Sequence, residues 1–309
     1  MSTVELLCLG EPMLEFNQTS QDPQGRPLFL QGHGGDTSNA AIAAARAGAR
    51  VGYITAIGCD APGDSFMKLW AEEGVDTSTV LRDPEAPTAI YFVSHGPDGH
   101  QFTFYRTGSA ISRMVPGDVP VDAFRPARIL HLSGISQAIS STACDTCFRA
   151  IEVAKAAGVK VSYDTNLRKA LWPVQRAAAI MHAAIAQADI VLPSMDDATE
   201  LTGLKDPDAI ADFYLKLAPL VLLKLGKDGS MVATRDGRTR IPGQKVKAVD
   251  ATGAGDTFAG NFLARTLAGD TPEDAARYAN AAAALATTGY GAVAPMPRPD
   301  AVRAMLAKG

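Results

Sequence analysis

The sequence lacks an excess of positive charge, because its 309 residues include 29 Lys and Arg against 33 Asp and Glu, for a net charge of −4. Nucleic-acid binding depends on clustered positive charge, so we expect no nucleic-acid partner. The four cysteines are too few for a disulfide scaffold. No apolar run reaches the roughly 18 residues of a membrane helix, so we expect no membrane partner.

The sequence also lacks the signs of secretion and of a metal centre. It begins Met-Ser-Thr-Val-Glu, without a basic region or a long apolar one, and together with the few cysteines this predicts a reducing, cytoplasmic location. The five histidines show no metal-ligand spacing. Cys144 and Cys147 share a helix face, but there is no second Cys-x-x-Cys for zinc. Structural thiols are therefore favoured over a redox motif.

What the sequence does contain is an alternation of short apolar runs with alanine-rich helical patterns. The predicted strands cover 4–9, 51–57, 129–132, 159–163, 190–192 and 221–225. The predicted helices cover 39–47, 65–73, 142–157, 176–187, 208–217, 257–267 and 272–287. Near-continuous apolar strands between helices predict an α/β fold with a mostly parallel sheet covered on both faces.

Two segments interrupt this alternation, at about 11–33 and 87–110, where aromatic and polar residues alternate. Residues 91–93 and 101–105 around the turn 96–99 predict a β-hairpin. These segments are either surface hairpins or a lid over a pocket, and the lid is favoured because binding residues gather on such loops. We therefore expect one domain, 1–309, with a lid whose exposed apolar face pairs across a homodimer.

The sharpest local signal is the glycine-rich run at 250–260. Gly253 and Gly255 allow a tight turn and close approach of another molecule. The helix that follows opens near Gly255 and presents unbonded amides suited to phosphate oxygens. Asp256 lies in its first turn, where a carboxylate can accept a proton from an attacking hydroxyl. The alternative is an ordinary helix start with an acidic cap.

Two other nucleotide-binding patterns are missing. There is no Gly-x-x-x-x-Gly-Lys-[Ser/Thr], which excludes a P-loop enzyme. The segment 32–35 follows no clear buried strand and lacks the third glycine of a dinucleotide fingerprint, which disfavours a nicotinamide dehydrogenase.

The run 250–260 resembles the C-terminal signature of the ribokinase-like (PfkB) carbohydrate kinases. Further similar segments, in family order, are Gly34-Gly35-Asp36-Thr37-Ser38-Asn39, Ile57-Gly58-Cys59-Asp60, Asp164-Thr165-Asn166-Leu167-Arg168 and Lys224-Leu225-Gly226-Lys227-Asp228-Gly229. The similarity covers about residues 4–300. Within the family, segments 34–39, 132–136 and 104–106 look most like 2-keto-3-deoxygluconate kinases.

The resemblance implies a three-layer α/β/α fold with a β lid, and transfer of the γ-phosphoryl group of ATP to a sugar hydroxyl. Asp256 would be the base. The implied anion hole is Gly253, Ala254 and Gly255. Mg²⁺ would bridge the nucleotide phosphates, and a monovalent cation such as K⁺ would lie near Asp250 and Thr252.

The resemblance also implies a nucleotide site. ATP would be bound by Ser194, Lys224, Gly226, Gly229, Gly253, Gly255 and Asn280. The segment 194–197 stands where the family has Asn-x-x-Glu, and Asp197 would then act on Mg²⁺ through water. For Asn280, a polar position on an alanine-rich helix is an equally good interpretation.

2-Keto-3-deoxygluconate carries a carboxylate at one end and a primary hydroxyl at the other, so its site needs a cation as well as a base. Arg106 and Arg168 offer planar charged forks for the carboxylate. The other expected sugar contacts are Gly34, Gly35, Asp36, Asn39, Tyr91, Tyr105 and Asp256. Asp36 could instead cap a helix. Phe104 replaces a tyrosine that similar family members often have, which bears on substrate preference.

Three alternatives stay open at this point. A sibling kinase would act on fructose or another ketose. A non-catalytic sugar or nucleotide sensor would bind without turnover, although Asp256 argues against it. A nicotinamide dehydrogenase would bind a dinucleotide.

Overall fold

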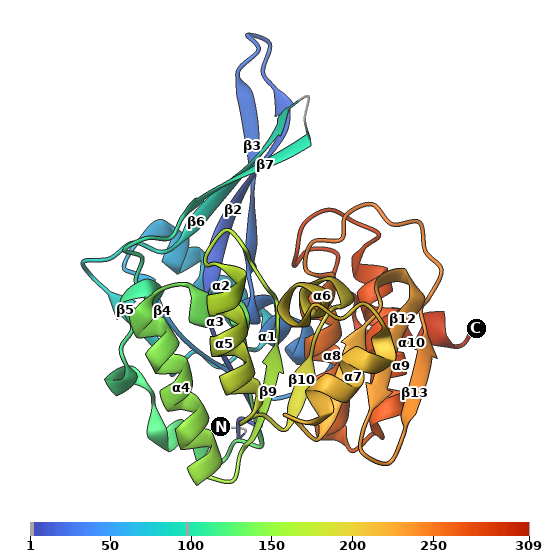
Figure 1. Cartoon of the computed structure of the whole chain (residues 1–309). Helices are drawn as coiled ribbons and strands as arrows, with labels where there is room; N and C mark the ends of the chain where they lie inside the picture. The colour runs from blue at the N-terminus through green and yellow to red at the C-terminus, as the bar shows by residue number, and fades with distance from the viewer. Residues whose placement is uncertain (1–2, 97–98, 309) are drawn as a thin grey trace.

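The computed structural model describes residues 3–96 and 99–308. The predicted turn residues Pro97 and Asp98 lie outside the described residues. Within the described ranges the chain forms a large sheet between two layers of helices, with a smaller sheet that extends away from this body (Figure 1).

The large sheet has the strand order β13-β12-β11-β10-β9-β8-β1-β4-β5 in the described residues. Its strands are β1 (Leu6–Leu9), β4 (Val51–Gly58), β5 (Val80–Asp83), β8 (Ile129–Ser133), β9 (Lys160–Asp164), β10 (Ile190–Leu192), β11 (Leu220–Lys224), β12 (Gly229–Ala233) and β13 (Arg238–Pro242). The pairs from β5 to β11 are parallel, whereas β12 and β13 add antiparallel to the edge.

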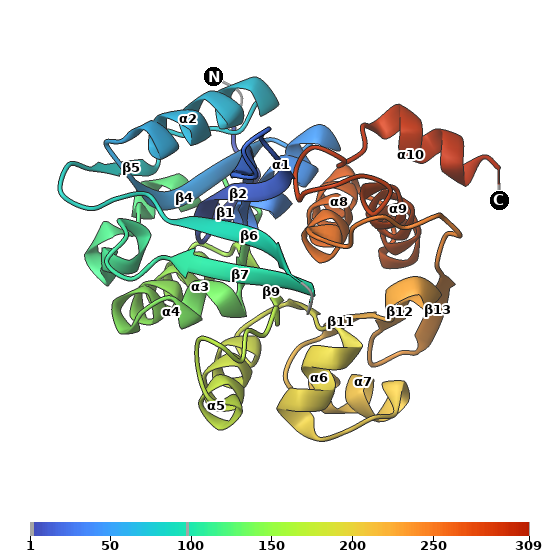
Figure 2. The same cartoon turned by 90° about the horizontal axis from the view of Figure 1, so that it is seen from above.

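Helices cover both faces of this sheet (Figure 2). On one side lie α1 (Thr37–Arg46), α2 (Ala61–Glu73), α8 (Ala254–Ala268), α9 (Pro272–Ala286) and α10 (Pro299–Leu306). On the other lie α3 (Gly134–Ala138), α4 (Ser141–Ala156), α5 (Val174–Ile185), α6 (Met195–Thr202) and α7 (Pro207–Leu215). Short 3₁₀ turns occupy Ile111–Arg113, Pro116–Asp118, Val121–Phe124 and Gly226–Asp228.

The predicted α/β/α fold is confirmed. Residues of β4 are buried along its whole length and β8 likewise, because helices cover both of their faces. Each of the six predicted strands corresponds to a parallel strand of the large sheet. The sequence patterns missed β5 and β13, which lie at the two edges of the sheet and are poorly buried, and also missed the buried strand β12.

The small sheet, called the lid here, consists of β2 (Pro12–Gln21), β3 (Pro27–Gly35), β6 (Ile90–Gly96) and β7 (Gly99–Tyr105) in the order β3-β2-β6-β7. It therefore combines both irregular segments of the sequence. Alternation along the strands gives the lid two faces. Phe92 stacks on Phe16 on one face, while Tyr91 stacks on Phe104 on the other.

Close packing of α1 on α8 positions the ends of both helices. A Cβ atom at Gly260 would lie 2.3 Å from the carbonyl oxygen of Ala40, so only glycine allows this separation of the two helices. The contact brings Asn39 of α1 next to Asp256 of α8 at the carboxyl edge of the parallel strands, which is where open α/β sheets bind ligands.

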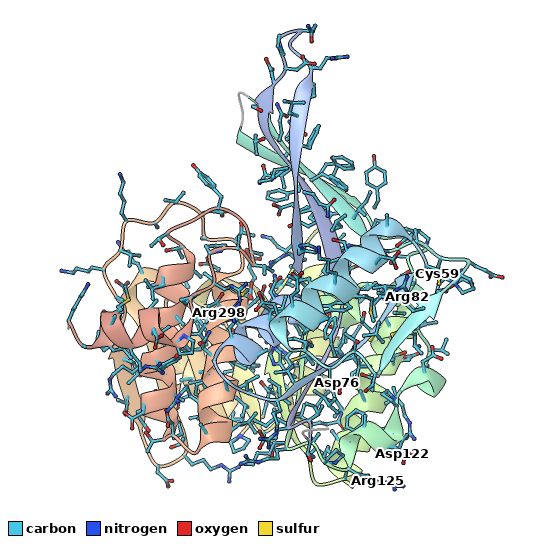
Figure 3. The ribbon with its side chains drawn as sticks, turned by 180° about the vertical axis from the view of Figure 1, so that it is seen from behind. Cys59, Asp76, Arg82, Asp122, Arg125 and Arg298 are labelled. Atoms are coloured by element: carbon cyan, nitrogen blue, oxygen red, sulfur yellow. The ribbon has the colours of Figure 1, made fainter. Side chains whose placement is uncertain are left out.

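Cys144 and Cys147, for which the sequence favours structural thiols, lie in α4. All four cysteines are free thiols, and burial raises the pKa of Cys144 and Cys147. Cys59 is exposed next to Arg82 (Figure 3). Among the residues that the structure describes, no helix is long and apolar enough to span a membrane.

Candidate active site

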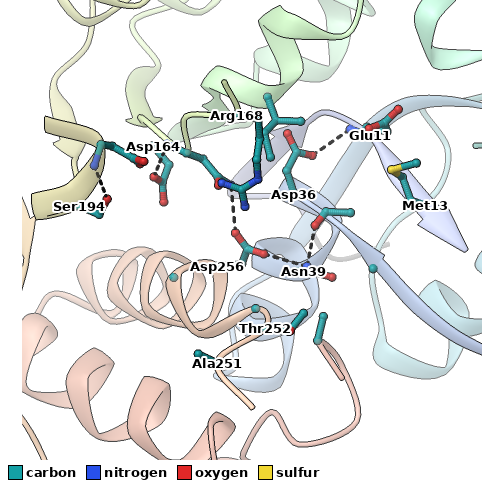
Figure 4. Close-up of a pocket in the computed structure, with 18 of the residues that line it drawn as sticks. Glu11, Met13, Asp36, Asn39, Asp164, Arg168, Ser194, Ala251, Thr252 and Asp256 are labelled. Carbon is teal, nitrogen blue, oxygen red and sulfur yellow. Dashed lines mark hydrogen bonds between the residues drawn. The ribbon is translucent and has the colours of Figure 1, made fainter. Parts of the chain in front are cut away.

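A cleft of about 840 Å³ opens at the carboxyl edge of the parallel strands, beneath the lid. Its walls come from segments that are far apart in the chain: the loop after β1, the start of α1, the lid, the loop after β9, the start of α6 and the start of α8. In Figure 4 the side chains of Asp256, Asn39 and Arg168 point toward the same space.

The start of α8 carries Asp256. Gly253 precedes the helix with φ of 73°, a left-handed conformation that favours glycine, and a Cβ atom there would lie 2.9 Å from the carbonyl oxygen of Ala292. Asp256 accepts a hydrogen bond from Asn39 Nδ2 at 2.8 Å and a longer one from Asn166 Nδ2 at 3.5 Å. These bonds fix the carboxylate facing the cleft.

Unbonded amides lie beside this carboxylate. In residues 3–96 and 99–308, the amides of Gly255 and Asp256 donate to no protein acceptor, whereas the Ala254 amide donates to Ala251 O at 3.2 Å. Ala254 was expected in the anion hole, but its amide is already bonded. The free amides and the helix dipole together suit an anion at this helix start.

The environment of Asp256 makes its carboxylate a stronger base. Burial raises the pKa of Asp256 to about 7, and the negative charges of Asp164 and Asp36 add to the rise. The Asn39 hydrogen bond and the charge of Lys224 lower it in part. A base with a pKa near neutrality suits proton transfer at physiological pH.

A buried ion pair forms the opposite wall. Lys224 Nζ lies 2.6 Å from Asp164 Oδ2, and the two side chains are 15% and 4% exposed. Lys224 Nζ also lies 3.6 Å from where a Cβ of Gly255 would be, so this ammonium group faces the free amides of α8. Positive charge and amide donors therefore converge on one part of the cleft.

A second buried ion pair lies at the lid end of the cleft. Arg106, which follows β7, has Nη2 3.2 Å from Oε2 of Glu11, a carboxylate that follows β1 and is 1% exposed. The guanidinium group also lies over the ring of Phe104 at 4.9 Å. Burial raises the pKa of Glu11 to about 7, the Arg106 charge lowers it and the Asp36 charge raises it.

Asp36 is a structural residue of the cleft wall. Its carboxylate caps α1 through the Thr37 amide and also accepts from the Glu11 amide at 2.9 Å. The hydroxyls of Ser133 and Ser136 donate to its other oxygen at 2.7 and 2.8 Å. The helix cap that the sequence offered as one alternative is confirmed, whereas a contact between Asp36 and the sugar stays a prediction.

The loop after β9 contributes Asn166 and Arg168. Asn166 has a φ of 33°, which is uncommon for a residue other than glycine, and this conformation directs its amide toward Asp256. Arg168 lines the cleft, and its Nη1 donates to Leu167 O at 3.1 Å. Arg106 lines the same cleft.

The two lid tyrosines lie on opposite faces. Tyr91 lines the cleft, and its hydroxyl donates to Glu15. Tyr105 is 61% exposed and packs edge-on against Phe92 on the outer face. The expectation that Tyr105 lines the sugar site is not met, because alternation places Tyr105 opposite to Phe104 and Arg106.

Gly34 and Gly35 lie at the end of β3, where the lid joins the cleft. A Cβ at Gly34 would lie 2.6 Å from the Tyr91 hydroxyl oxygen, so that glycine allows the close approach of the tyrosine. Gly35 has φ of 128°, and a Cβ there would lie 2.3 Å from Glu11 O. Both residues line the cleft, as does Asn39.

The expected nucleotide residues divide into two groups. Ser194, Lys224, Gly226, Gly253 and Gly255 line the cleft. Asn280 and Gly229 lie outside its lining. The Asn280 amide donates to Ile241 O at 3.1 Å, which fixes α9 to β13, and a Cβ at Gly229 would lie 2.1 Å from that same carbonyl oxygen. Both residues thus have packing roles here.

Two acidic groups were expected to hold cations. Asp197 lines the cleft next to Asp196 and accepts from Thr165 Oγ1 at 2.9 Å. This pair of carboxylates fits Mg²⁺, which is commonly held by one or two carboxylates together with water and substrate phosphates.

Asp250 accepts hydrogen bonds from Thr252 N, Thr252 Oγ1 and Gly291 N at 2.6 to 2.9 Å, and these bonds order the loop before α8. K⁺ binding at Asp250 and Thr252 stays a prediction.

Residues 4–299 match the sequence profile described as pfkB family carbohydrate kinase. The chain belongs to the PfkB family of carbohydrate kinases. It is therefore a phosphotransferase with an alcohol acceptor, and the resemblance of its motifs to this family is confirmed.

Relatives of this PfkB kinase include enzymes with different sugars. It is 35% identical to 2-dehydro-3-deoxygluconokinase of Thermoproteus tenax, over 98% of this chain and 94% of that protein. It is 34% identical to fructokinase-1 of Oryza sativa subsp. japonica, over 94% of both chains. The crystal structure of fructokinase with bound ATP from Xylella fastidiosa matches with a TM-score of 0.90 at 28% identity, covering 99% of each chain.

Sequence reasoning missed several residues of this PfkB site. Asp164 is the last residue of β9, and Glu11 and Asn166 come two residues after β1 and β9. This position at the carboxyl ends of parallel strands was the signal that could have identified them. Asp164 and Asn166 even stood within a motif quoted for the family. Glu11 gave no local sign of its pairing with Arg106, which is 95 residues away in the chain.

Proposed function

We propose that this PfkB kinase phosphorylates 2-keto-3-deoxygluconate with ATP, giving 2-keto-3-deoxy-6-phosphogluconate. The observation that carries the proposal is that Arg106 and Arg168 border the same cleft as Asp256. A keto-acid needs a cation for its carboxylate and a base for its distant hydroxyl, and this cleft offers both. The Thermoproteus tenax relative is named for this substrate.

The residues support a direct transfer. Asp256 accepts the proton of the sugar hydroxyl while that oxygen forms a bond to the γ-phosphorus and the bond to the β-phosphate oxygen breaks, releasing ADP. The amides of Gly255 and Asp256, together with Lys224, face the oxygens that gain charge. Asn39 orients the carboxylate through its 2.8 Å hydrogen bond.

Asp197 and Asp196 would hold Mg²⁺, and the ion would supply charge neutralisation to the nucleotide phosphates. The four free thiols favour a reducing compartment, and we propose the cytoplasm.

The second candidate function is phosphorylation of fructose or another ketose. It is favoured by the rice relative and by the Glu11–Arg106 pair, since Arg106 already has a carboxylate partner. A coupled assay of ADP release across keto-deoxy acids, ketoses and nucleosides separates the two. Higher kcat/KM for the keto-acid supports the proposal, whereas higher kcat/KM for an uncharged ketose overturns it. Binding without turnover would instead indicate a sensor.

Replacing Arg168 with Lys should raise KM for the keto-acid by about 10-fold or more, because a point charge cannot reproduce a bidentate fork. KM for ATP should change little. Arg149→Lys, at an exposed position on α4, is the matched control. An unchanged KM for the keto-acid would exclude Arg168 as the carboxylate ligand.

The pH dependence of kcat should report on Asp256. Because its pKa is about 7, the carboxyl group is protonated below that pH and cannot accept the hydroxyl proton. At saturating ATP and keto-acid, whose negative charges raise the Asp256 pKa further, we expect kcat to fall about tenfold per pH unit below pH 7 and to level off at higher pH. A kcat that stays constant from about pH 5.5 to 8 would contradict this role.

We further propose a homodimer formed through the lid. Leu30 and Phe102 of the lid are 64% and 52% exposed, and apolar surface of this kind favours association. Light scattering should give twice the 32.3 kDa mass of the chain. Leu30→Glu should give monomers and Val121→Glu, at an exposed site outside the lid, should not. A monomeric wild-type protein that is fully active would refute the dimer.

A further inference from the structure

Glu11 and Arg106 line the cleft, and each has a buried polar atom without a hydrogen-bond partner among the described residues. Glu11 binds Arg106 Nη2 through Oε2, but its Oε1 has no hydrogen-bond partner among the described residues. Arg106 Nε has none in the same part of the chain. Buried polar groups are normally bonded, so an unpartnered acceptor and an unpartnered donor on two residues that line a cleft indicate groups that a ligand satisfies.

Arg106 already has a carboxylate partner at this end of the cleft. Arg106 is matched by Glu11, and Asp36 lies close enough to Glu11 to raise its pKa. A ligand carboxylate placed on Arg106 would bring two carboxylates onto one guanidinium group, with a third nearby. Like charges in a buried site disfavour full ionisation of all members.

Glu11 is the member of this group that can change its charge. The oxygens of Asp36 are occupied by two backbone amides and two serine hydroxyls. Tyr53, which also faces Glu11, has a pKa well above its usual range and stays neutral. Burial has already raised the pKa of Glu11 to about 7, so a further negative charge shifts it above neutral pH.

We propose that Glu11 is a specificity residue that takes up one proton from solvent when the cleft binds a keto-acid. The neutral carboxyl group then releases Arg106 to the ligand carboxylate and donates its O–H to the ligand. An uncharged ketose leaves Glu11 ionised and paired with Arg106, and a ligand hydroxyl donates to Oε1. The proposal rests on the proposed function, because it concerns how the keto-acid is accepted.

Calorimetric titration tests the proposed uptake of a proton by Glu11. 2-Keto-3-deoxygluconate is added to the full chain at about pH 7.5 without nucleotide, in buffers of different ionisation enthalpy, and the slope of the binding enthalpy gives the protons bound. We expect about 0.5 to 1 proton per site for the wild type. Glu11→Gln, which mimics the neutral form, should still bind the keto-acid but take up about no proton. Asp256→Asn, which removes the other carboxylate with a pKa near 7, should keep the uptake.

A second measurement needs no variant. The wild-type Kd for the keto-acid should rise with pH from about 7 to 9, approaching tenfold per unit, while the Kd for fructose stays constant. Keto-acid binding without proton uptake, or uptake that persists in Glu11→Gln, overturns this inference and leaves the proposed function standing. Absence of keto-acid binding together with turnover of a ketose overturns the proposed function, and this inference with it.

Discussion

Asp256→Asn should lower kcat by about 10²- to 10⁴-fold, because the amide cannot accept the proton of the sugar hydroxyl. The replacement keeps the size of the side chain, and its oxygen can still accept the hydrogen bond that Asn39 donates at 2.8 Å. The free amides at the start of α8 are unaffected. We therefore expect Kd for ATP to change little, measured by calorimetry on the same preparation.

The control for this variant is Asp300→Asn, at a carboxylate that is 95% exposed on α10. It should retain wild-type kcat. Turnover by Asp256→Asn at the wild-type rate would remove Asp256 as the base. A loss of ATP binding that parallels the loss of kcat would show instead that Asp256 acts on the nucleotide.

Lys224→Met should reduce both activity and stability. Lys224 neutralises Asp164 across 2.6 Å in a site where both groups are nearly buried. Removing one partner leaves a buried unpaired charge, so we expect the free energy of unfolding to fall by about 3 kcal/mol. Because Lys224 also faces the amides of α8, kcat/KM should fall by about 10²-fold.

The double variant Lys224→Met with Asp164→Asn separates the two effects. Without the unpaired carboxylate, the free energy of unfolding in urea should return to within about 1 kcal/mol of the wild type, while kcat/KM stays low. If the double variant recovers activity along with stability, Lys224 is a structural residue only. If neither single nor double variant loses stability, the buried pair does not stabilise the fold.

The parts of the fold that were predictable from the sequence depend on local patterns. Alternation of apolar runs and helices gave the three layers, since each run becomes a strand buried on both faces. Gly253 and Asp256 were identifiable because a helix start and its flanking glycine are encoded within a few residues. The irregular composition of the lid segments likewise distinguished them from the parallel strands.

The parts that were not predictable depend on contacts between distant segments. Glu11 meets Arg106 only because β1 and the lid meet at the cleft. Asn280 was expected near the nucleotide or on a polar helix face, but α9 packs on β13 and the Asn280 amide donates to a β13 carbonyl oxygen. Tyr105 was misplaced because both lid tyrosines were assigned to the cleft without reference to the strand register, which directs Tyr105 and Phe104 to opposite faces.

The central claim is that the cleft brings a sugar hydroxyl, Asp256 and the terminal phosphorus of ATP together for direct transfer. Phosphorus NMR of the wild-type protein with Mg²⁺, ATP and 2-keto-3-deoxygluconate tests this most directly. We predict that the γ-phosphate signal disappears as a phosphomonoester signal appears, split by the two protons of the C6 methylene group. Formation of inorganic phosphate alone, or an ATP spectrum that does not change, would contradict the account.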